Sequence, residues 1–90
     1  MNGLSWRTID EIMQDLAKRV KNIRKRRGLT QMDISNMSGV SYGSIKRFEA
    51  SGEISLYSLV RISIALDCVN EIENLFTNVE YKSIEEILNE

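Results

Sequence analysis

The sequence predicts an all-α protein with one compact core, and three observations support this fold class. Proline is absent from the 90 residues, and no stretch alternates apolar and polar residues for long enough to form a strand. Apolar residues instead recur at spacings of three and four, the period of an amphipathic helix. Two capping boxes, at Thr8–Glu11 and Ser83–Glu86, mark helix starts. The length suits a single domain.

The first helix is predicted to run from Thr8 to about Arg27. Its apolar residues form one stripe: Ile9, Ile12, Leu16, Val20 and Ile23. Gly28 can adopt the left-handed conformation that ends many helices, and the basic residues before it complement the negative end of the helix dipole. The pattern leaves open whether this region forms one long helix or two.

A short second helix is predicted after Thr30, which is a suitable N-cap. Ile34 and Met37 are expected on its inner side, and Gly39 ends it.

A third helix is predicted from the Ser41 N-cap to Ser51-Gly52, with Ile45 and Phe48 facing the core. Its outward positions are polar or small: Ser41, Tyr42, Gly43, Ser44, Lys46 and Arg47. A glycine turn between two short helices can project the second of them as a ridge that enters a DNA major groove.

Three further helices are predicted after this pair. Ser55 caps the fourth, whose apolar pattern is Leu56, Leu59, Val60 (or Ser63) and Leu66. The fifth is expected at about residues 70–76, with Ile72, Leu75 and Phe76. Ser83 opens a short tail helix that contains Ile84, Ile87 and Leu88.

The charge is distributed unevenly along the chain, although the net charge is only −1. Residues 1–48 carry ten Lys/Arg and four Asp/Glu, whereas residues 49–90 carry two Lys/Arg and nine Asp/Glu. One half can therefore attract a polyanion while the other repels it. Solvated helix faces account for such runs equally well, so the asymmetry alone does not decide for nucleic acid.

The composition argues against most classes of enzyme. Histidine is absent and Cys68 is the single cysteine, which excludes the usual zinc sites, an intramolecular disulfide and histidine-dependent catalysis. No catalytic constellation, cofactor or metal is expected. Cys68 lies in an apolar stretch and is expected to pack in the core. No apolar run is long enough to span a membrane, and the acidic N-terminus does not resemble a signal peptide, so a cytoplasmic protein is expected.

The segment from Leu29 to Glu49 resembles the helix-turn-helix of the Cro/repressor-type (Xre-like) family. The resemblance rests on the Leu29-Thr30-Gln31 start, the Gly39-Val40-Ser41 turn, Ser44-Ile45 and the Phe48-Glu49 close. It covers about residues 16–76 and implies a five-helix, lambda-repressor-like DNA-binding domain. Residues 1–15 are then a helical N-terminal extension, and residues 77–90 a tail with a short helix.

The resemblance also implies which residues contact the phosphates of DNA. Gln31 is expected to bind phosphate from the N-terminus of the second helix, and Ser41 from the start of the third. Lys46 is expected to reach phosphate or a base edge. Arg24 matches a residue that pairs with Glu49 and can also contact phosphate. For Gln31 the alternative is a solvated side chain near a helix cap.

The base-reading positions implied by the resemblance are Tyr42, Gly43 and Arg47. Arg47 is the strongest candidate, because a guanidinium can bind guanine O6 and N7 with two hydrogen bonds. Gly43 departs from the polar residue common in the family, which puts base reading there in doubt; a small residue would instead permit close approach. Tyr42 could alternatively fold onto the core.

In function, the resemblance implies a transcriptional repressor that binds double-stranded DNA with a palindromic operator as a homodimer. Ile72, Leu75 and Phe76 could pack in the monomer or at the two-fold interface. One alternative is a DNA-binding antitoxin, similar to the HipB-like proteins that pair with a HipA-like kinase, with a toxin bound through the termini. Another is a protein-interaction module that has lost DNA binding.

Overall fold

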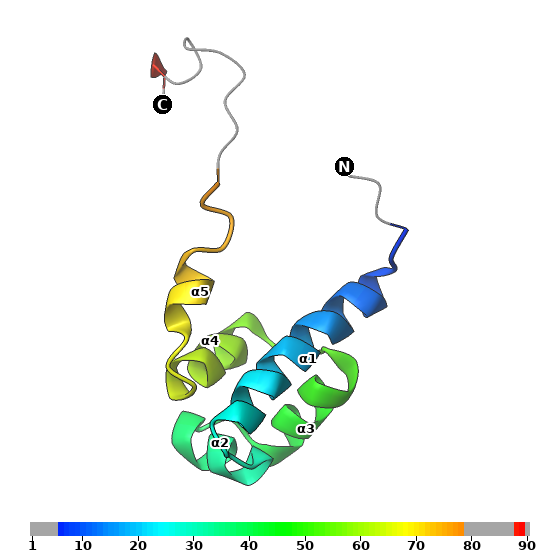
Figure 1. The fold of residues 1–90 in the computed structure, drawn as a ribbon, viewed down its shortest axis with the longest axis vertical. Coiled ribbons are helices and arrows are strands. Elements are labelled where there is room, and N and C mark those ends of the chain that lie inside the picture. The colour runs from blue at the N-terminus through cyan, green and yellow to red at the C-terminus, as the bar shows by residue number, and fades with distance from the viewer. Residues whose placement is uncertain (1–5, 79–87, 90) are drawn as a thin grey trace.

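The computed structural model describes residues 6–78, 88 and 89. This part of the chain contains five helices and no strand, which confirms the all-α prediction (Figure 1). The helices are α1 (Ile9–Arg26), α2 (Gln31–Ser38), α3 (Tyr42–Ser51), α4 (Leu56–Ala65) and α5 (Val69–Glu73). The tail helix predicted after Ser83 lies almost entirely outside the described residues.

Helix α1 is a single unbroken helix, which settles the question that the sequence left open. Its capping box is present in both directions. Thr8 Oγ1 accepts a hydrogen bond from the Glu11 amide at 3.1 Å, and Glu11 Oε1 accepts from the Thr8 amide at 2.8 Å. Gly28 follows the helix with a φ of +69°, the left-handed conformation expected at this position.

The N-caps predicted for the next three helices are confirmed. Thr30, Ser41 and Ser55 each accept a hydrogen bond from the backbone amide three residues later. Asp33 completes a second capping box with Thr30 that the sequence analysis did not identify. The backbone hydrogen bond from Thr30 holds the pKa of the Asp33 carboxyl below its ordinary value.

The core lies where the C-terminal half of α1 meets the other helices. Helix α3 packs against α1, α2 packs against both α3 and α4, and α5 packs against α4 (Figure 1). The buried apolar residues are Ala17, Ile34, Val40, Ile45, Phe48, Ile62 and Leu66. Val20, Ile23, Leu29, Ile54 and Cys68 pack around the edge of this core.

Two residues predicted to face the core are exposed instead. Met37 is 54% exposed because the inner face of α2 is formed by Ile34 and Ser38. Leu56, the first residue of α4, lies outside the face that buries Ile62 and Leu66.

Phe76, for which the sequence left packing in the monomer and a two-fold interface as alternatives, is exposed, because α5 ends at Glu73, earlier than predicted. Phe76 lies beyond that end with a φ of +58° and is 95% exposed.

The apolar stripe of α1 is buried only in part. Ala17 is fully buried, and Val20 and Ile23 pack against the core. Ile9, Ile12 and Leu16 are exposed by 76%, 49% and 41%, because the first turns of α1 project beyond the other helices (Figure 1). The stripe predicted from Thr8 onward therefore continues past the core, and its N-terminal part remains an exposed apolar surface.

Candidate nucleic-acid interface

The turn between α2 and α3 has the geometry that a helix-turn-helix requires. Gly39 ends α2 with a φ of +77°, and Val40 is 95% buried between the two helices. Two hydrogen bonds hold the turn: Ser35 Oγ donates to the Val40 carbonyl at 2.7 Å, and the Val40 amide donates to Ser38 Oγ at 3.0 Å. The role predicted for Gly39 is confirmed, and the direction of α3 is fixed by these contacts.

Helix α3 divides into a buried face and a solvent face, as predicted. Ile45 and Phe48 are each 1% exposed and anchor the helix in the core. The six residues predicted to face outward are all exposed: Ser41, Tyr42, Gly43, Ser44, Lys46 and Arg47. The solvent face of α3 is therefore small and polar, and two of its members are cations.

On one flank of this face, Tyr42 and Lys46 form a cation–π pair. Lys46 Nζ lies 5.3 Å from the centroid of the Tyr42 ring, within the range in which an ammonium is attracted to an aromatic face. The ring remains 39% exposed. Tyr42 thus stays on the surface beside Lys46 and is not part of the core.

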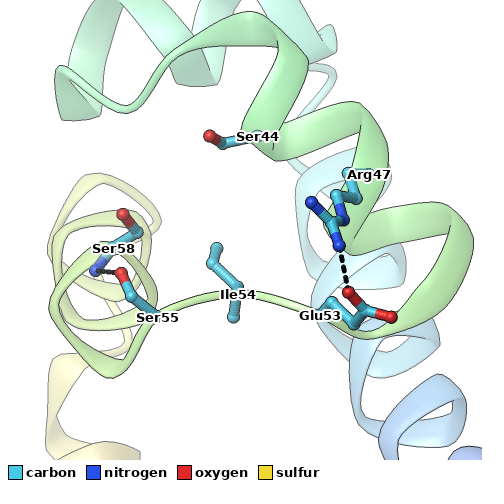
Figure 2. Close-up of a pocket in the computed structure, with 6 residues that line it drawn as sticks. All are labelled: Ser44, Arg47, Glu53, Ile54, Ser55 and Ser58. Carbon is cyan, nitrogen blue, oxygen red and sulfur yellow. Dashed lines mark hydrogen bonds and ion pairs between the residues drawn. The ribbon is translucent and has the colours of Figure 1, made fainter.

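On the other flank, Arg47 forms an ion pair with Glu53, a residue of the loop between α3 and α4 (Figure 2). Nη2 of Arg47 donates to Glu53 Oε1. The pair borders a pocket of about 450 Å³ lined by Ser44, Arg47, Glu53, Ile54, Ser55 and Ser58. The hydroxyls and the two charges make this pocket polar, and both charged side chains are more than half exposed.

Gly43 lies on the solvent face of α3. A Cβ built at this position would meet no atom within 4 Å. The fold therefore has room for a larger residue, and glycine lowers helix stability relative to alanine. Nothing within the free protein explains the absence of a side chain here.

Beneath α3, Arg24 and Glu49 form the buried ion pair that the resemblance implied. Arg24 Nε and Nη2 donate to the two Glu49 carboxylate oxygens at 2.7 and 2.9 Å, and Nη1 donates to the Leu29 carbonyl at 2.7 Å. Gln31 Nε2 also donates to Glu49, at 2.9 Å. This network ties the end of α1 to α3 and to the first residue of α2.

The network sets the ionisation of Glu49. Burial raises the pKa of its carboxyl group, but the hydrogen bonds from Arg24 and Gln31 outweigh burial, and the pKa lies below its ordinary value. Glu49 is therefore charged in the folded protein at neutral pH.

The network also orients two of the residues predicted to bind phosphate. Gln31 Nε2 carries two hydrogens, so its bond to Glu49 leaves the second for another acceptor. Arg24 is 8% exposed, and all three of its nitrogens donate within the protein. Little of its surface is left for a phosphate.

Sequence reasoning did not identify Glu53 and Arg61 as residues near this surface. Arg61 Nε donates to the Ser38 carbonyl at 2.7 Å at the end of α2, and its Nη1 donates to the Tyr57 hydroxyl. Arg61 is 23 residues from Ser38, and Glu53 is separated from Arg47 by the end of a helix. Neither pair has the three- or four-residue spacing that indicates a contact on a helix.

Among the described residues, no group of three or more His, Cys, Asp or Glu side chains could hold a metal ion. Cys68 is half-buried against the core, and burial raises the pKa of its thiol. No helix in the same part of the chain is long and apolar enough to cross a membrane.

Comparison with known proteins identifies the fold. The helix-turn-helix family model matches residues 20–74, from the middle of α1 to the residue after α5. No curated protein matches the chain. The match covers more than half of the sequence and contains the turn at Gly39 and the whole of α3. The chain belongs to the helix-turn-helix family of the Cro/C1 (Xre-like) type, and it is a DNA-binding regulator.

Proposed function

We propose that the protein is a sequence-specific repressor that inserts α3 into the major groove of a palindromic operator. The observation that carries this proposal is the division of α3 between a face anchored by Ile45 and Phe48 and a polar solvent face. A helix held this rigidly can present side chains to a groove about 12 Å wide without reorganisation. In this role the protein acts in the cytoplasm.

The contacts fall into two classes. Arg47 reads a guanine, and the bare backbone at Gly43 lets a base edge or sugar approach closely, with Tyr42 beside it. Ser41, Lys46 and Gln31 bind phosphates and set the register of α3 on the duplex. We assign Arg24 a positioning role, because it is buried and holds Glu49 and, through it, the Gln31 amide.

We propose that two copies bind together through α1 and α5. One recognition helix covers one half-site, and palindromic operators are read by two-fold symmetric dimers. A groove of about 310 Å³ lies between α1, α4 and α5, lined mostly by apolar residues that include Leu16, Val20, Ile72 and Leu75. Arg19 and Glu71 also line it, so a two-fold arrangement can pair opposite charges as well as bury apolar surface.

Sedimentation of a single-residue variant tests this dimer. Leu16→Glu places a charge in the groove and should convert a dimer to a monomer. Leu56→Glu is the matched control, because Leu56 is 69% exposed and does not line the groove. A wild-type protein that sediments as a monomer at all concentrations would contradict the proposal.

A second candidate function is a DNA-binding antitoxin, and the exposed stripe of α1 favours it. Ile9 and Ile12 are exposed and precede residue 20, where the family match begins. An apolar surface outside the DNA-binding domain suits a protein partner. The test is whether the product of a neighbouring gene arrests growth and is neutralised by the wild-type chain but not by Ile12→Glu, with DNA binding by that variant unchanged.

The main test of the function is selection of bound duplexes from a random pool, followed by titration at two salt concentrations. A recurring palindrome, bound with a salt-dependent affinity, supports a dimeric sequence-specific regulator. Absence of enrichment, together with absence of binding to random DNA, would favour a protein-interaction module.

A further inference from the structure

Glu53 lies on the edge of the solvent face of α3, beside the residue proposed to read guanine. Among the six residues that line the pocket in Figure 2, Glu53 is the acidic one. Glu49, the acidic residue within α3 itself, points to Arg24 and is not on this edge. A carboxylate at the edge of a DNA-reading helix repels phosphate, so it requires an explanation.

The position of Glu53 is fixed by the backbone as well as by its ion pair. Ser51 Oγ donates to the Arg47 carbonyl at 2.7 Å and accepts from the Glu53 amide at 3.2 Å. The Gly52 amide donates to the Phe48 carbonyl at 2.7 Å, and the left-handed Gly52 turns the chain back toward α3. The backbone at the end of α3 therefore places Glu53 next to Arg47, independently of the ion pair between the two side chains.

The ion pair occupies only part of the guanidinium. Glu53 engages Arg47 through Nη2, and a guanidinium carries five N–H donors in a fixed planar fork. Donors remain with which Arg47 can bind guanine. The side chains are 70% and 54% exposed, so the pair contributes little to folding.

Charge compensation affects the two modes of DNA binding differently. Binding to random DNA depends on cations that neutralise phosphates, and Glu53 cancels the charge of Arg47 in that role. Binding to a specific base depends on hydrogen-bond geometry, which the pair preserves by holding the guanidinium in place. The ammonium of Lys46, by contrast, lies over the Tyr42 ring, which carries no charge.

We propose that Glu53 is a specificity-determining residue, which weakens binding to random DNA by neutralising Arg47 and orients the guanidinium for guanine. This inference rests on the proposed reading role of Arg47. The loop after α3 then helps the protein to distinguish its operator from random DNA, whereas the basic residues supply affinity for both.

The test compares Glu53→Gln with the wild-type protein on two probes: a 20-bp duplex of random sequence and the duplex enriched by selection. The variant should bind the random duplex about two- to fivefold more tightly at low salt. The slope of log affinity against log salt should steepen by about 0.9, the value for one more neutralised phosphate. Binding to the enriched duplex should gain less, so the ratio of the two affinities should fall.

Three further variants test whether the effect is specific to Glu53 and its pairing with Arg47. Glu73→Gln removes the same charge from exposed α5 and should change binding to both duplexes less than Glu53→Gln does. In an Arg47→Ala background, Glu53→Gln should lose most of its effect on the specificity ratio. Ser51→Ala, which removes the hydrogen-bond link to Glu53, should shift the ratio in the same direction by a smaller amount.

The failure of this inference can be told apart from the failure of the proposed function. Glu53→Gln could leave the ratio of the two affinities unchanged, or change the affinity for each duplex by the same amount as Glu73→Gln does. Either result would show that Glu53 does not determine specificity, even though the protein reads DNA. If random DNA is bound but no duplex is enriched, the proposed reading role of Arg47 fails and the specificity role of Glu53 fails with it. Absence of binding to any DNA overturns both proposals.

Discussion

Gly52, at the end of α3, packs directly against the backbone of Met13 in α1. A Cβ built on Gly52 would lie 2.7 Å from both the carbonyl carbon and the carbonyl oxygen of Met13. Gly52 also has a φ of +83°, which residues with a side chain adopt only at a cost. The close approach of α3 to α1 therefore depends on the absence of a single methyl group.

Gly52→Ala is expected to destabilise the protein strongly. Gly28 supplies the matched control, because its φ is also positive, at +69°, but a Cβ there meets nothing within 4 Å. Gly28→Ala should cost about 1–2 kcal/mol from backbone strain alone, and Gly52→Ala at least about 2 kcal/mol more. Urea unfolding measures both values. Equal costs would show that α1 moves aside without penalty.

The Arg24–Glu49 pair is expected to dominate the polar contribution to stability. Glu49→Gln leaves the Arg24 charge buried without its partner and should lower the free energy of unfolding by about 3 kcal/mol. The double variant Arg24→Met/Glu49→Leu removes both charges and should recover part of that loss. A double variant less stable than Glu49→Gln would contradict the assignment of the cost to an unpaired charge.

Stability should also fall in acid because of Glu49. Its pKa is lowered by folding, so its ionised form stabilises the protein above the ordinary glutamate pKa of about 4.3. That stabilisation is lost progressively as the pH falls from this value through the lower pKa of the folded state. Thermal unfolding between pH 7 and pH 3 should show a steeper decline for the wild type than for Glu49→Gln.

Gly43→Ala is expected to separate stability from function. The new methyl group fits in open space and raises helix propensity, so the free energy of unfolding should rise by up to about 1 kcal/mol. Affinity for the enriched duplex should nevertheless fall, because the methyl group occupies the space that we assign to DNA. A stabilised variant with unchanged affinity would remove Gly43 from the interface.

Arg47 and Lys46 should differ in what their loss does to DNA binding. Arg47→Ala should cost about 1–3 kcal/mol at one base pair of the enriched duplex and relax the preference there. Arg47→Lys keeps the positive charge but lacks the planar guanidinium that can form two hydrogen bonds to guanine. Relative to Arg47→Ala, it should therefore restore affinity for random DNA but not the base preference. Lys46→Ala should weaken all duplexes alike and reduce the salt slope by about 1. Equal effects of Arg47→Ala on both duplexes would exclude base reading.

Much of the fold follows from local signals in the sequence. Thr8, Thr30, Ser41 and Ser55 cap helices through hydrogen bonds that span three residues, and Gly39 ends α2 through its own backbone. Such caps form between residues that are close in the sequence, so they can be predicted from the sequence alone. The division of α3 into two faces follows from its period in the same way.

What could not be predicted depends on where helices meet. Whether Met37 or Ser38 faces inward depends on the angle at which α2 lies against α4, which the apolar pattern of a short helix does not determine. The exposed part of the α1 stripe has the same period as the buried part, and only the lengths of the neighbouring helices distinguish them. At the candidate site, the turn at Gly52 was predicted, but the Arg47–Glu53 pair across it spans six residues and lacks the three- or four-residue spacing that indicates a contact on a helix.

The continuity of α1 has a consequence for operator length. Its 18 residues extend about 27 Å, and the buried Arg24 joins its far end to α3. If two copies meet through the groove between α1 and α5, a rigid helix rather than a flexible linker sets the separation of the two recognition helices. Inserting one base pair between half-sites rotates one of them by about 34°. The dimer would then bind two correct half-sites only when the number of base pairs between them matches the fixed separation of its two recognition helices.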